Sequence, residues 1–469
     1  MGKTKIRFGT DGWRAVISDE FTFANVEIIA QTMADYLIET KTAERGIVVG
    51  YDYRFHSENY ALRVAEIVAS NNIPVYLSDT ALPTPALSFA AKQRQTGGGI
   101  MITASHNPPI YNGIKFKAPY GGSATKEITS AIEKHLYQTP PKREQILFQK
   151  NIQKLDLVAP YLAQLRSFVN LDAIKSYPIK VVADSLYGVG KYYLEQILSD
   201  GKIRVKTIRG DRDALFGGIL PEPIPKNLGM LMDEVPKCGA VIGLATDGDS
   251  DRIGVVDEQG RFVTPHHLIP ILFEHLKKTR NWSGDVVRTL STASMIDKLA
   301  AEYGAKVTEV PVGFKNVADL MIQQDILIGG EESGGIGIKN HIPERDGLLL
   351  GLLMLECLVT TGKKPSELVA DLESRFGKLV YDRIDSHCPD EIRLGLINRL
   401  KSEPPDKIAD IAVDKLSSYD GVKFYFVDGS WMLIRASDTE PVVRIYVGSD
   451  SEQKTVSILN AGRVICGIK

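Results

Sequence analysis

The chain has 469 residues, too many for a single hydrophobic core, and its length predicts about three to four domains. It is 43% hydrophobic and 24% charged, as ordinary globular proteins are, and its net charge of −2 excludes a general attraction to nucleic acid or membranes. The sequence shows neither a Cys-x-x-Cys pair nor an apolar signal core, nor a run near the ~20 apolar residues of a membrane span, so we expect a cytoplasmic protein without a cysteine-based zinc site.

Short β-rich segments alternate with helical segments through most of the chain, which predicts α/β layers with parallel or mixed sheets. In the first part we expect strands at 47–51, 75–77 and 99–103 and helices at 25–39 and 60–70. A polar stretch with prolines at 139–149 is expected to be a linker.

The same alternation begins twice more along the chain. We expect strands at 179–183, 205–208 and 240–244, a helix at 190–197 and a hairpin at 253–263. The third series has strands at 285–289, 306–310 and 326–328 and helices at 294–303 and 348–358.

The end of the chain has a different pattern, with antiparallel strands at 422–427, 431–435 and 442–447 and a closing helix at 452–464. We therefore predict three consecutive similar α/β/α domains with mixed sheets and a C-terminal α+β domain. The expected boundaries are 1–142, 155–256, 257–370 and 375–469.

Three carboxylates, Asp247, Asp249 and Asp251, occupy alternate positions directly after the apolar run 240–245. Acids this close repel one another unless a cation lies between them, and oxygen ligands suit Mg²⁺, which usually keeps room for phosphate oxygens. A solvated acidic turn fits poorly, because another apolar stretch follows at 253–256.

Two other interpretations of these aspartates are weaker. A calcium loop needs Gly at its sixth position, where Arg252 stands. A phosphatase with an aspartate nucleophile would leave Asp251 and Arg252 without a role.

Four more polar loops follow predicted strands, at the sheet edge where α/β proteins bind ligands. The first carries Ser105 and His106 with Lys115 close behind, and the absence of Gly-x-Ser-x-Gly excludes an ordinary serine hydrolase. The others carry acceptors suited to sugar hydroxyls, or cations suited to phosphate. Each loop alone has an ordinary explanation as a cap or turn, but five in series favour a sugar-phosphate site. The residues concerned are Gly313, Lys315, Glu331, Ser333, Arg435 and Arg444.

The chain resembles the α-D-phosphohexomutase superfamily, the phosphoglucomutase/phosphomannomutase enzymes, over essentially its whole length. The resemblance is carried by TASHNP at 103–108, DGDSDR at 247–252, GEESG at 330–334 and RASDTEP at 435–441, with FGTDGWR at 8–14. It implies four domains around a central cleft. It also implies reversible phosphoryl transfer between the 1- and 6-positions of a hexose phosphate, through a phosphoserine and a hexose 1,6-bisphosphate.

The resemblance assigns roles to individual residues. Ser105 would carry the phosphoryl group, and its phosphate would share Mg²⁺ with the three aspartates. Arg14, His106, Lys115 and Arg252 would add positive charge. Residues implied to bind substrate are Arg252, Gly313, Lys315, Glu331, Ser333, Arg435, Ser437, Asp438, Thr439 and Arg444. Asp438 departs from the Gly or Asn that relatives often carry, so its role is open.

The general acid or base departs from the family pattern. Some relatives have His where Gly335 stands, and others have Lys where Arg345 stands. Arginine stays protonated and is a poor proton acceptor, so Arg345 is expected to act electrostatically. His341 is the first candidate and Lys115 the second, although His341 also fits a packing residue at a helix entry.

Glucose phosphate is the first expected substrate, with mannose phosphate also accepted and glucose 1,6-bisphosphate as activator. Phosphoglucosamine mutase is the enzymatic alternative, less favoured because its members usually have Gln at Glu332 and His at Gly335. A non-catalytic sugar-phosphate sensor would have lost Ser105 or one aspartate, and none is missing. We expect small hexose phosphates as partners, no nucleic acid and no membrane, while the sequence carries no signal for an oligomeric state.

Overall fold

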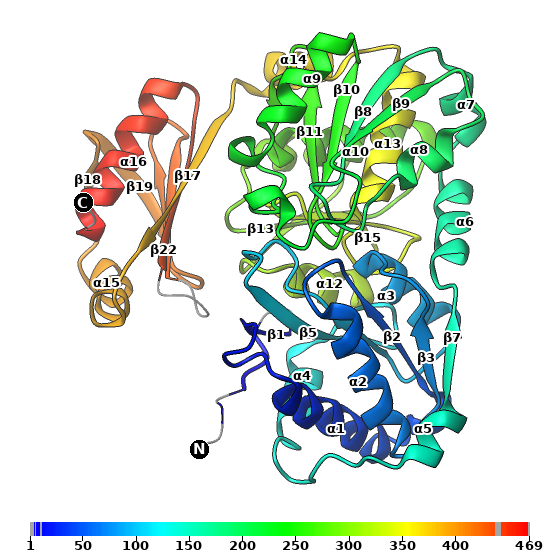
Figure 1. Ribbon diagram of the computed structural model, residues 1–469. Coiled ribbons are helices and arrows are strands. Elements are labelled where there is room, and N and C mark those ends of the chain that lie inside the picture. The colour runs from blue at the N-terminus through cyan, green and yellow to red at the C-terminus, as the bar shows by residue number, and fades with distance from the viewer. Residues whose placement is uncertain (1–3, 5, 10–11, 437–441, 468–469) are drawn as a thin grey trace.

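The computed structural model describes residues 4, 6–9, 12–436 and 442–467 (Figure 1). It contains three consecutive α/β/α domains, I to III, and a C-terminal domain IV, so the predicted fold class is confirmed. Within these residues, every helix is too short or too polar to cross a membrane.

Domain I contains a seven-stranded mixed sheet in the order β1-β5-β4-β2-β3-β7, with β6 paired to β5. Its strands are β1 (Trp13–Val16), β2 (Ile47–Tyr51), β3 (Val75–Ser78), β4 (Gly99–Ile102), β5 (Tyr111–Ala118), β6 (Gly122–Ser123) and β7 (Ile152–Leu155). Its helices are α1 (Phe23–Glu39), α2 (Ser57–Ala69), α3 (Thr84–Gln93), α4 (Lys126–Glu133) and α5 (Gln145–Asn151).

Local sequence explains the central elements of this domain. Every residue of β2 is buried, as expected for an apolar strand covered by helices on both faces. Helix α1 begins after Thr22, whose side chain accepts a hydrogen bond from the amide of Asn25, and buries Val26, Ile29, Met33 and Leu37 along one face.

The linker prediction for 139–149 is wrong at its end, where α5 begins at Gln145. Phe148 packs against the domain I core, and the chain then adds β7 parallel to β3. The sheet of domain I therefore continues beyond residue 142.

Domain II has the sheet order β12-β11-β10-β8-β9, and domain III the order β14-β13-β15-β16. The strands of domain II are β8 (Lys180–Asp184), β9 (Arg204–Ile208), β10 (Ile242–Thr246), β11 (Ile253–Asp257) and β12 (Phe262–Val263). Those of domain III are β13 (Asp285–Thr289), β14 (Val307–Val310), β15 (Ile326–Gly330) and β16 (Ile336–Ile338). The helices from the end of domain I to domain III are α6 (Val158–Phe168), α7 (Leu171–Ser176), α8 (Tyr193–Leu198), α9 (Gly229–Cys238), α10 (Pro265–Arg280), α11 (Met295–Glu302), α12 (Phe314–Gln323), α13 (Gly347–Thr361) and α14 (Pro365–Phe376).

Helix α13 joins domains II and III because it is apolar on nearly every side. It packs against β10 and β11 of domain II and against α10 of domain III. A single hydrophobic cluster runs through it and continues into domain I at Leu82 and Leu87. Domains I to III thus share a continuous core.

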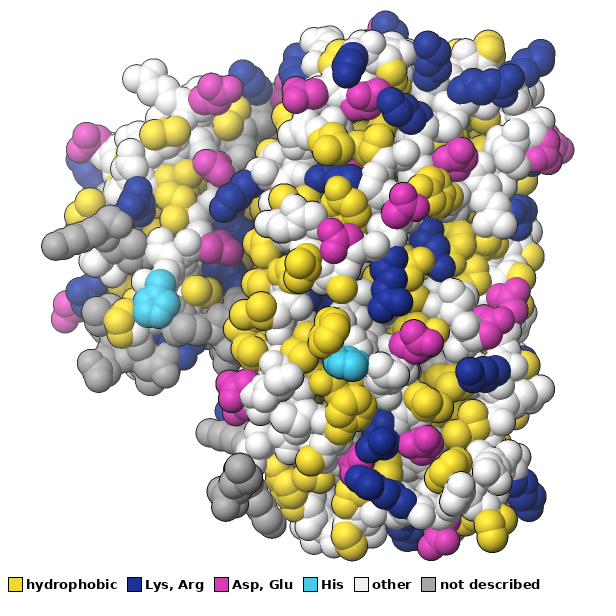
Figure 2. Space-filling view, viewed as in Figure 1, with side chains coloured by type: hydrophobic (Ala, Val, Ile, Leu, Met, Phe, Trp, Pro, Cys, Tyr) yellow, Lys and Arg dark blue, Asp and Glu magenta, His cyan; other side chains and the backbone are white. Residues whose placement is uncertain are grey.

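Domain IV is an antiparallel sheet in the order β17-β22-β21-β20-β19-β18, with a core of its own. Its elements are β17 (Val380–His387), α15 (Asp390–Ser402), β18 (Lys407–Ile408), β19 (Ile411–Ser417), β20 (Val422–Phe426), β21 (Trp431–Ala436), β22 (Val442–Ser449) and α16 (Glu452–Cys466). Figures 1 and 2 show it as a separate lobe beside the other domains. It touches domain III through a small cluster that includes Leu290, Trp431 and Tyr446.

Candidate active site

The loops that follow β4, β10 and β15 meet where domains I, II and III come together. We call residues 103–110 the serine loop, 247–252 the aspartate loop and 331–335 the glutamate loop. Each begins at the carboxyl end of a buried strand, which is where α/β sheets bind ligands.

Ser105 has a left-handed backbone conformation, with φ of 52°. Its hydroxyl donates a hydrogen bond of 2.9 Å to Oδ2 of Asp247 and lies 3.3 Å from Nδ1 of His106. Non-glycine residues seldom adopt a positive φ, and those that do cluster at functional sites. The serine hydroxyl is therefore held directly against the aspartate loop.

The three aspartates are fully buried, and one carboxylate oxygen from each lies within 4.8 Å of the others. Oδ1 of Asp249 and Oδ1 of Asp251 have no hydrogen-bond partner, which is unusual for buried carboxylates. Uncompensated oxygens in an all-carboxylate set are suitable ligands for a hard divalent cation. The cluster thus fits the predicted Mg²⁺.

Neighbouring groups separate the pKa values of these aspartates. Burial, and then the charges of Asp249 and Asp251, raise the pKa of Asp247 well above its usual value. Burial also raises the pKa of Asp251, although Arg345 opposes it. Burial acts in the same direction on Asp249, but Lys115 and Thr84 outweigh it and hold the pKa of Asp249 below the usual value.

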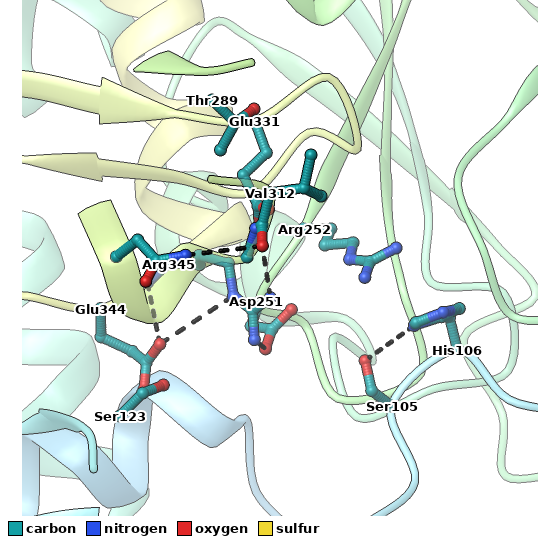
Figure 3. A network of polar contacts seen from close by, with 12 residues as sticks. Ser105, His106, Ser123, Asp251, Arg252, Thr289, Val312, Glu331, Glu344 and Arg345 are labelled. Carbon is teal, nitrogen blue, oxygen red and sulfur yellow. Dashed lines mark hydrogen bonds and ion pairs between the residues drawn. The ribbon is translucent and has the colours of Figure 1, made fainter. Parts of the chain in front are cut away.

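Two cations contact the aspartates from other domains. Lys115 on β5 donates to Oδ2 of Asp249 at 2.9 Å and lies 3.7 Å from Oδ2 of Asp251. Arg345 donates to Oδ2 of Asp251 at 2.5 Å and lies 3.9 Å from Glu331 and 4.0 Å from Glu344. Figure 3 shows Arg345 among these three carboxylates, with Ser105 on a neighbouring loop. The three aspartates thus form a negatively charged cluster, and Lys115 and Arg345 place positive charges next to it.

Three further predicted residues lie in the serine loop or near it: His106 within the loop, and Arg14 and Arg252 beside it. Arg14 on β1 donates to Oδ1 of Asn107 at 2.5 Å. Arg252 lies 3.3 Å from Glu222, and its Nε has no hydrogen-bond partner. Burial, and then the charges of Arg252 and Arg14, lower the pKa of His106 well below its usual value. Its imidazole is therefore neutral near pH 7 and does not add the positive charge that was expected of it.

The glutamate loop lies on the domain III side. Glu331 accepts a hydrogen bond of 3.0 Å from the amide of Gly313, and burial raises the pKa of Glu331 to about 7, although Arg345 opposes the shift. The hydroxyl of Ser333 has no hydrogen-bond partner. Lys315 lies in the first turn of α12, half-buried, where its charge acts on Asp319 and Glu127.

Domain IV contributes Arg435 and Arg444, which are register partners on β21 and β22. Arg435 donates to Oδ1 of Asp420 at 2.9 Å, and Arg444 to Oδ2 of Asp385 at 3.4 Å. Oδ2 of Asp420 accepts from the amide of Val312 at 2.7 Å, which ties this part of domain IV to the segment before α12. The remaining predicted residues of this loop lie outside the described part of the chain; they are Ser437, Asp438 and Thr439.

His341 makes its contacts away from the aspartates. Its Nε2 lies 2.9 Å from Oδ2 of Asp346, and its ring lies 5.6 Å from that of Phe168. Asp346 also accepts from the hydroxyl of Tyr161 and caps α13 at the amide of Leu349. These contacts match the packing role considered for His341 at a helix entry.

Two residues of the site had not been singled out from the sequence. Thr84, in the first turn of α3, donates to Oδ2 of Asp249 at 2.7 Å, and its amide donates to the carbonyl of Asp249. Glu222 pairs with Arg252 from a segment with Pro221 and Pro223 on either side. A polar residue between two prolines was the available signal for both, since Pro83 and Pro85 stand on either side of Thr84 as Pro221 and Pro223 stand on either side of Glu222. Thr84 also has an ordinary explanation as a residue at a helix start.

Four family models match the chain in order. They are described as Phosphoglucomutase/phosphomannomutase alpha/beta/alpha domain I, over residues 5–142, domain II over 159–260, domain III over 264–376, and the C-terminal domain over 395–461.

Individual proteins are similar over nearly the whole chain. A phosphoglucomutase/phosphomannomutase of Thermococcus kodakarensis is 31% identical, with 98% of each chain covered. A protein of Methanothermobacter thermautotrophicus named as a probable phosphoglucosamine mutase is also 31% identical, covering 95% of this chain and 94% of its own. A crystal structure of a Thermus thermophilus protein assigned as a phosphomannomutase has a TM-score of 0.86 at 35% identity, covering 98% of this chain and 99% of its own.

Proposed function

Since the chain belongs to the phosphoglucomutase/phosphomannomutase family, we propose that it moves a phosphoryl group reversibly between the 1- and 6-positions of a hexose phosphate. The predicted enzyme class, a phosphohexomutase, is confirmed by the same matches. Glucose phosphate is the proposed first substrate, and mannose phosphate the second. The observation that carries the proposal is the hydrogen bond between Ser105 and Asp247 in a buried, three-carboxylate cluster.

Ser105 is the proposed carrier of the phosphoryl group. The 6-hydroxyl of a hexose 1-phosphate attacks the phosphorus of phosphoserine, the bond from phosphorus to Oγ of Ser105 breaks, and the hydroxyl proton passes to a base. A hexose 1,6-bisphosphate results, and Ser105 is left as a hydroxyl once it takes up a proton. After the intermediate turns around, Oγ of Ser105 attacks the phosphorus of the 1-phosphate, the bond from that phosphorus to O1 breaks, the serine proton passes to the base and a proton passes to O1, and hexose 6-phosphate leaves.

Mg²⁺ is the proposed metal, held by Asp247, Asp249 and Asp251 together with the phosphate on Ser105. The unpartnered oxygens of Asp249 and Asp251 support this assignment. When bound, the ion would offset negative charge on the transferred phosphoryl oxygens. Lys115 and Arg345 hold the aspartates in place from domains I and III, so the site needs little rearrangement during the reaction.

Lys115 is the proposed proton carrier, in preference to His341. Its Nζ contacts Asp249 and Asp251, in the same loop as the Asp247 that binds Ser105, whereas His341 contacts Asp346. Arg345 keeps its proton at working pH and serves to stabilise negative charge.

Substrate hydroxyls are proposed to bind Glu331 and Ser333, whose hydroxyl has no partner in the protein. Gly313 and Lys315 border this loop. The distal phosphate is proposed to bind Arg435 and Arg444, with Ser437, Thr439 and, in an undetermined role, Asp438. The second candidate is phosphoglucosamine mutase, because a relative that is also 31% identical to this chain is named as a probable phosphoglucosamine mutase.

A panel of kcat/KM values for glucose, mannose and glucosamine phosphates, with Mg²⁺ and a trace of glucose 1,6-bisphosphate, tests this function. We expect glucose 1-phosphate to give the highest value and Ser105→Ala to lose at least about 10³-fold in kcat. Intact-mass measurement should find one phosphate on the peptide that carries Ser105. Undiminished turnover in Ser105→Ala would end the serine assignment.

A further inference from the structure

Arg54 lies beneath the serine loop and is fully buried. Its Nη1 donates to the carbonyls of Pro108 at 2.9 Å and Tyr111 at 3.0 Å. Its Nη2 donates to the carbonyls of Ser105 at 2.7 Å and Asn107 at 2.6 Å. One guanidinium thus binds three carbonyls of the serine loop, which has no regular secondary structure, and the carbonyl of Tyr111, the first residue of β5.

We infer that Arg54 is a positioning residue for phosphoryl transfer, which fixes the backbone of the serine loop so that the Ser105 hydroxyl stays against the aspartate loop. This inference rests on the proposed function. The Arg54 guanidinium donates to backbone carbonyls, among them the carbonyl of Ser105 itself, and acts on the Ser105 hydroxyl through that backbone.

The chemistry of arginine suits this task. A guanidinium presents five N–H donors in a rigid plane, whereas an ammonium has three donors on a flexible stem. Three carbonyls of the serine loop and that of Tyr111 converge on one point and need a planar fork, because the single ammonium group of lysine cannot reach all four in one geometry. Asp52 supplies the counter-charge, 3.4 Å from Nε of Arg54. Burial lowers the pKa of Arg54 to about 10, so the guanidinium is still charged at neutral pH.

Domain II closes the other side of this arrangement. The guanidinium carbon of Arg54 lies 5.0 Å from the ring centroid of Phe216. A Cβ atom added to Gly248 of the aspartate loop would lie 2.6 Å from the carbonyl oxygen of Ser105. The carbonyl that Arg54 binds is therefore also the atom against which the aspartate loop rests. A shift of that carbonyl would change the separation of Ser105 and Asp247.

Arg54→Lys tests the inference because it keeps the charge and removes the planar fork. We expect kcat to fall about 10²-fold while KM for glucose 1-phosphate changes less than about twofold, since the contacts proposed for the sugar hydroxyls and the distal phosphate lie in domains III and IV. Amide hydrogen exchange at residues 103–112 should become at least about tenfold faster, with domain III unchanged.

Arg209→Lys is the matched control. The side chain of Arg209 is only 6% exposed; it pairs with Asp184 and donates to the carbonyl of Asn227. Both partners lie in domain II, outside the serine loop. We expect it to lower the melting temperature as much as Arg54→Lys does while kcat stays within about twofold. Equal loss of kcat in both variants, or unchanged exchange at 103–112 in Arg54→Lys, would overturn the inference.

Hydrogen exchange separates this inference from the proposed function. A wild-type protein that does not turn over, or is not phosphorylated at Ser105, contradicts the proposed function. Amide hydrogen exchange at residues 103–112 tests the role of Arg54 whether or not the protein is active. If Arg54→Lys does not fold, Phe216→Leu tests the inference instead. This variant removes the ring that packs against Arg54 and keeps the guanidinium. A several-fold loss of kcat with faster exchange at 103–112 supports the inference, and unchanged values of both refute it.

Discussion

Ser105 and Asp247 are 142 residues apart in the chain, and one hydrogen bond joins them. At the scale of residues, the site consists of such long-range pairs. Asp249 binds Thr84 and Lys115 from domain I, and Asp251 binds Arg345 from domain III. The carboxylates of one loop thus hold residues from two other domains, so each substitution there tests both charge and geometry.

Lys115→Met and His341→Gln distinguish the two candidate proton carriers. We expect Lys115→Met to lower kcat about 10²- to 10⁴-fold, because it removes a positioned proton donor and acceptor. His341→Gln should keep kcat within about threefold and lower the melting temperature, because Asp346 loses a partner. Tyr161→Phe, which removes another hydrogen bond to Asp346, should behave like His341→Gln. The reverse order of kcat losses would restore His341 as the acid or base.

Mg²⁺ affinity should increase as pH rises. In the metal-free protein the pKa of Asp247 lies well above its usual value, so the cluster holds a proton that the cation must displace. Calorimetry in two buffers of different ionisation enthalpy should detect proton release on Mg²⁺ binding, and this release should diminish as pH rises through the raised pKa of Asp247. Chelation should abolish turnover, and added Mg²⁺ should restore it. An affinity that is independent of pH would contradict the shifted pKa.

The same shift affects stability in a defined direction. Because the folded, metal-free protein holds this proton more tightly than the unfolded chain, its free energy of unfolding should fall as pH rises through the raised pKa. Saturating Mg²⁺ should remove that fall, since the ion stabilises the charged carboxylates. Urea unfolding midpoints between pH 5 and 8 measure both effects.

The sequence motifs indicated which loops carry the acidic, cationic and glycine residues of the site, and the roles assigned to these residues remain predictions. Patterns could not indicate which side chain of one domain meets which side chain of another. Thr84 and Arg54 illustrate the limit: each stands in a segment with an ordinary local explanation, and only packing brings Thr84 to Asp249 and Arg54 to Ser105.

The strands and helices bring these residues together where domains I, II and III meet, and the loops between them approach one another closely enough to require glycine. Gly334 has φ of 85°, and a Cβ there would lie 2.2 Å from the carbonyl oxygen of Ile253. Gly248 faces the carbonyl of Ser105 in the same manner. At both positions backbone meets backbone, so no side chain can move aside to relieve a clash.

Gly248→Ala should therefore separate the serine and aspartate loops. We expect kcat to fall at least about tenfold and the melting temperature to decrease, because the added methyl group meets a carbonyl that Arg54 holds in place. Gly229→Ala, at the start of α9 with open space around it, is the control and should be neutral or slightly stabilising. Wild-type turnover in Gly248→Ala would show that the loops can separate without consequence.

Strands with continuous apolar runs were predictable, and β2 and β13 have the expected bounds. The helix expected at 190–197 begins only at Tyr193, because Leu186, Tyr187 and Lys191 adopt positive φ and keep the preceding segment in turns. Strands β1, β5 and β17 were not predicted. They mix polar and apolar residues, since much of their stabilisation comes from antiparallel partners rather than from their own composition.

At the scale of the whole molecule, domains I and III are joined by a buried ion pair. Nζ of Lys117 lies 2.7 Å from Oε2 of Glu344, and both side chains are inaccessible to solvent. Ser88 also donates to Glu344. The order of the domains was predictable from the motifs, but not their shared core, because that depends on which apolar faces pack together after each domain has formed.

Lys117→Met should destabilise the protein by about 3–5 kcal/mol, because it leaves Glu344 buried without its counter-charge. Lys117→Met combined with Glu344→Gln should recover part of this loss. Lys363→Met, in an exposed pair with Asp371, is the control and should change stability by less than about 1 kcal/mol. Urea unfolding measures all three, and equal effects of Lys117→Met and Lys363→Met would contradict a role for this pair in the interface.

The distance in sequence between Lys117 and Glu344 has a consequence during synthesis on the ribosome. A nascent chain in which both the serine loop and the aspartate loop have been synthesised still lacks Glu344, the carboxylate that pairs with Lys117. Until Glu344 emerges, the face of α3 that carries Ser88 also has no domain III to cover it. We expect prematurely terminated chains of this length to be recognised by chaperones and proteases, whereas loss of the C-terminal lobe alone leaves that face covered.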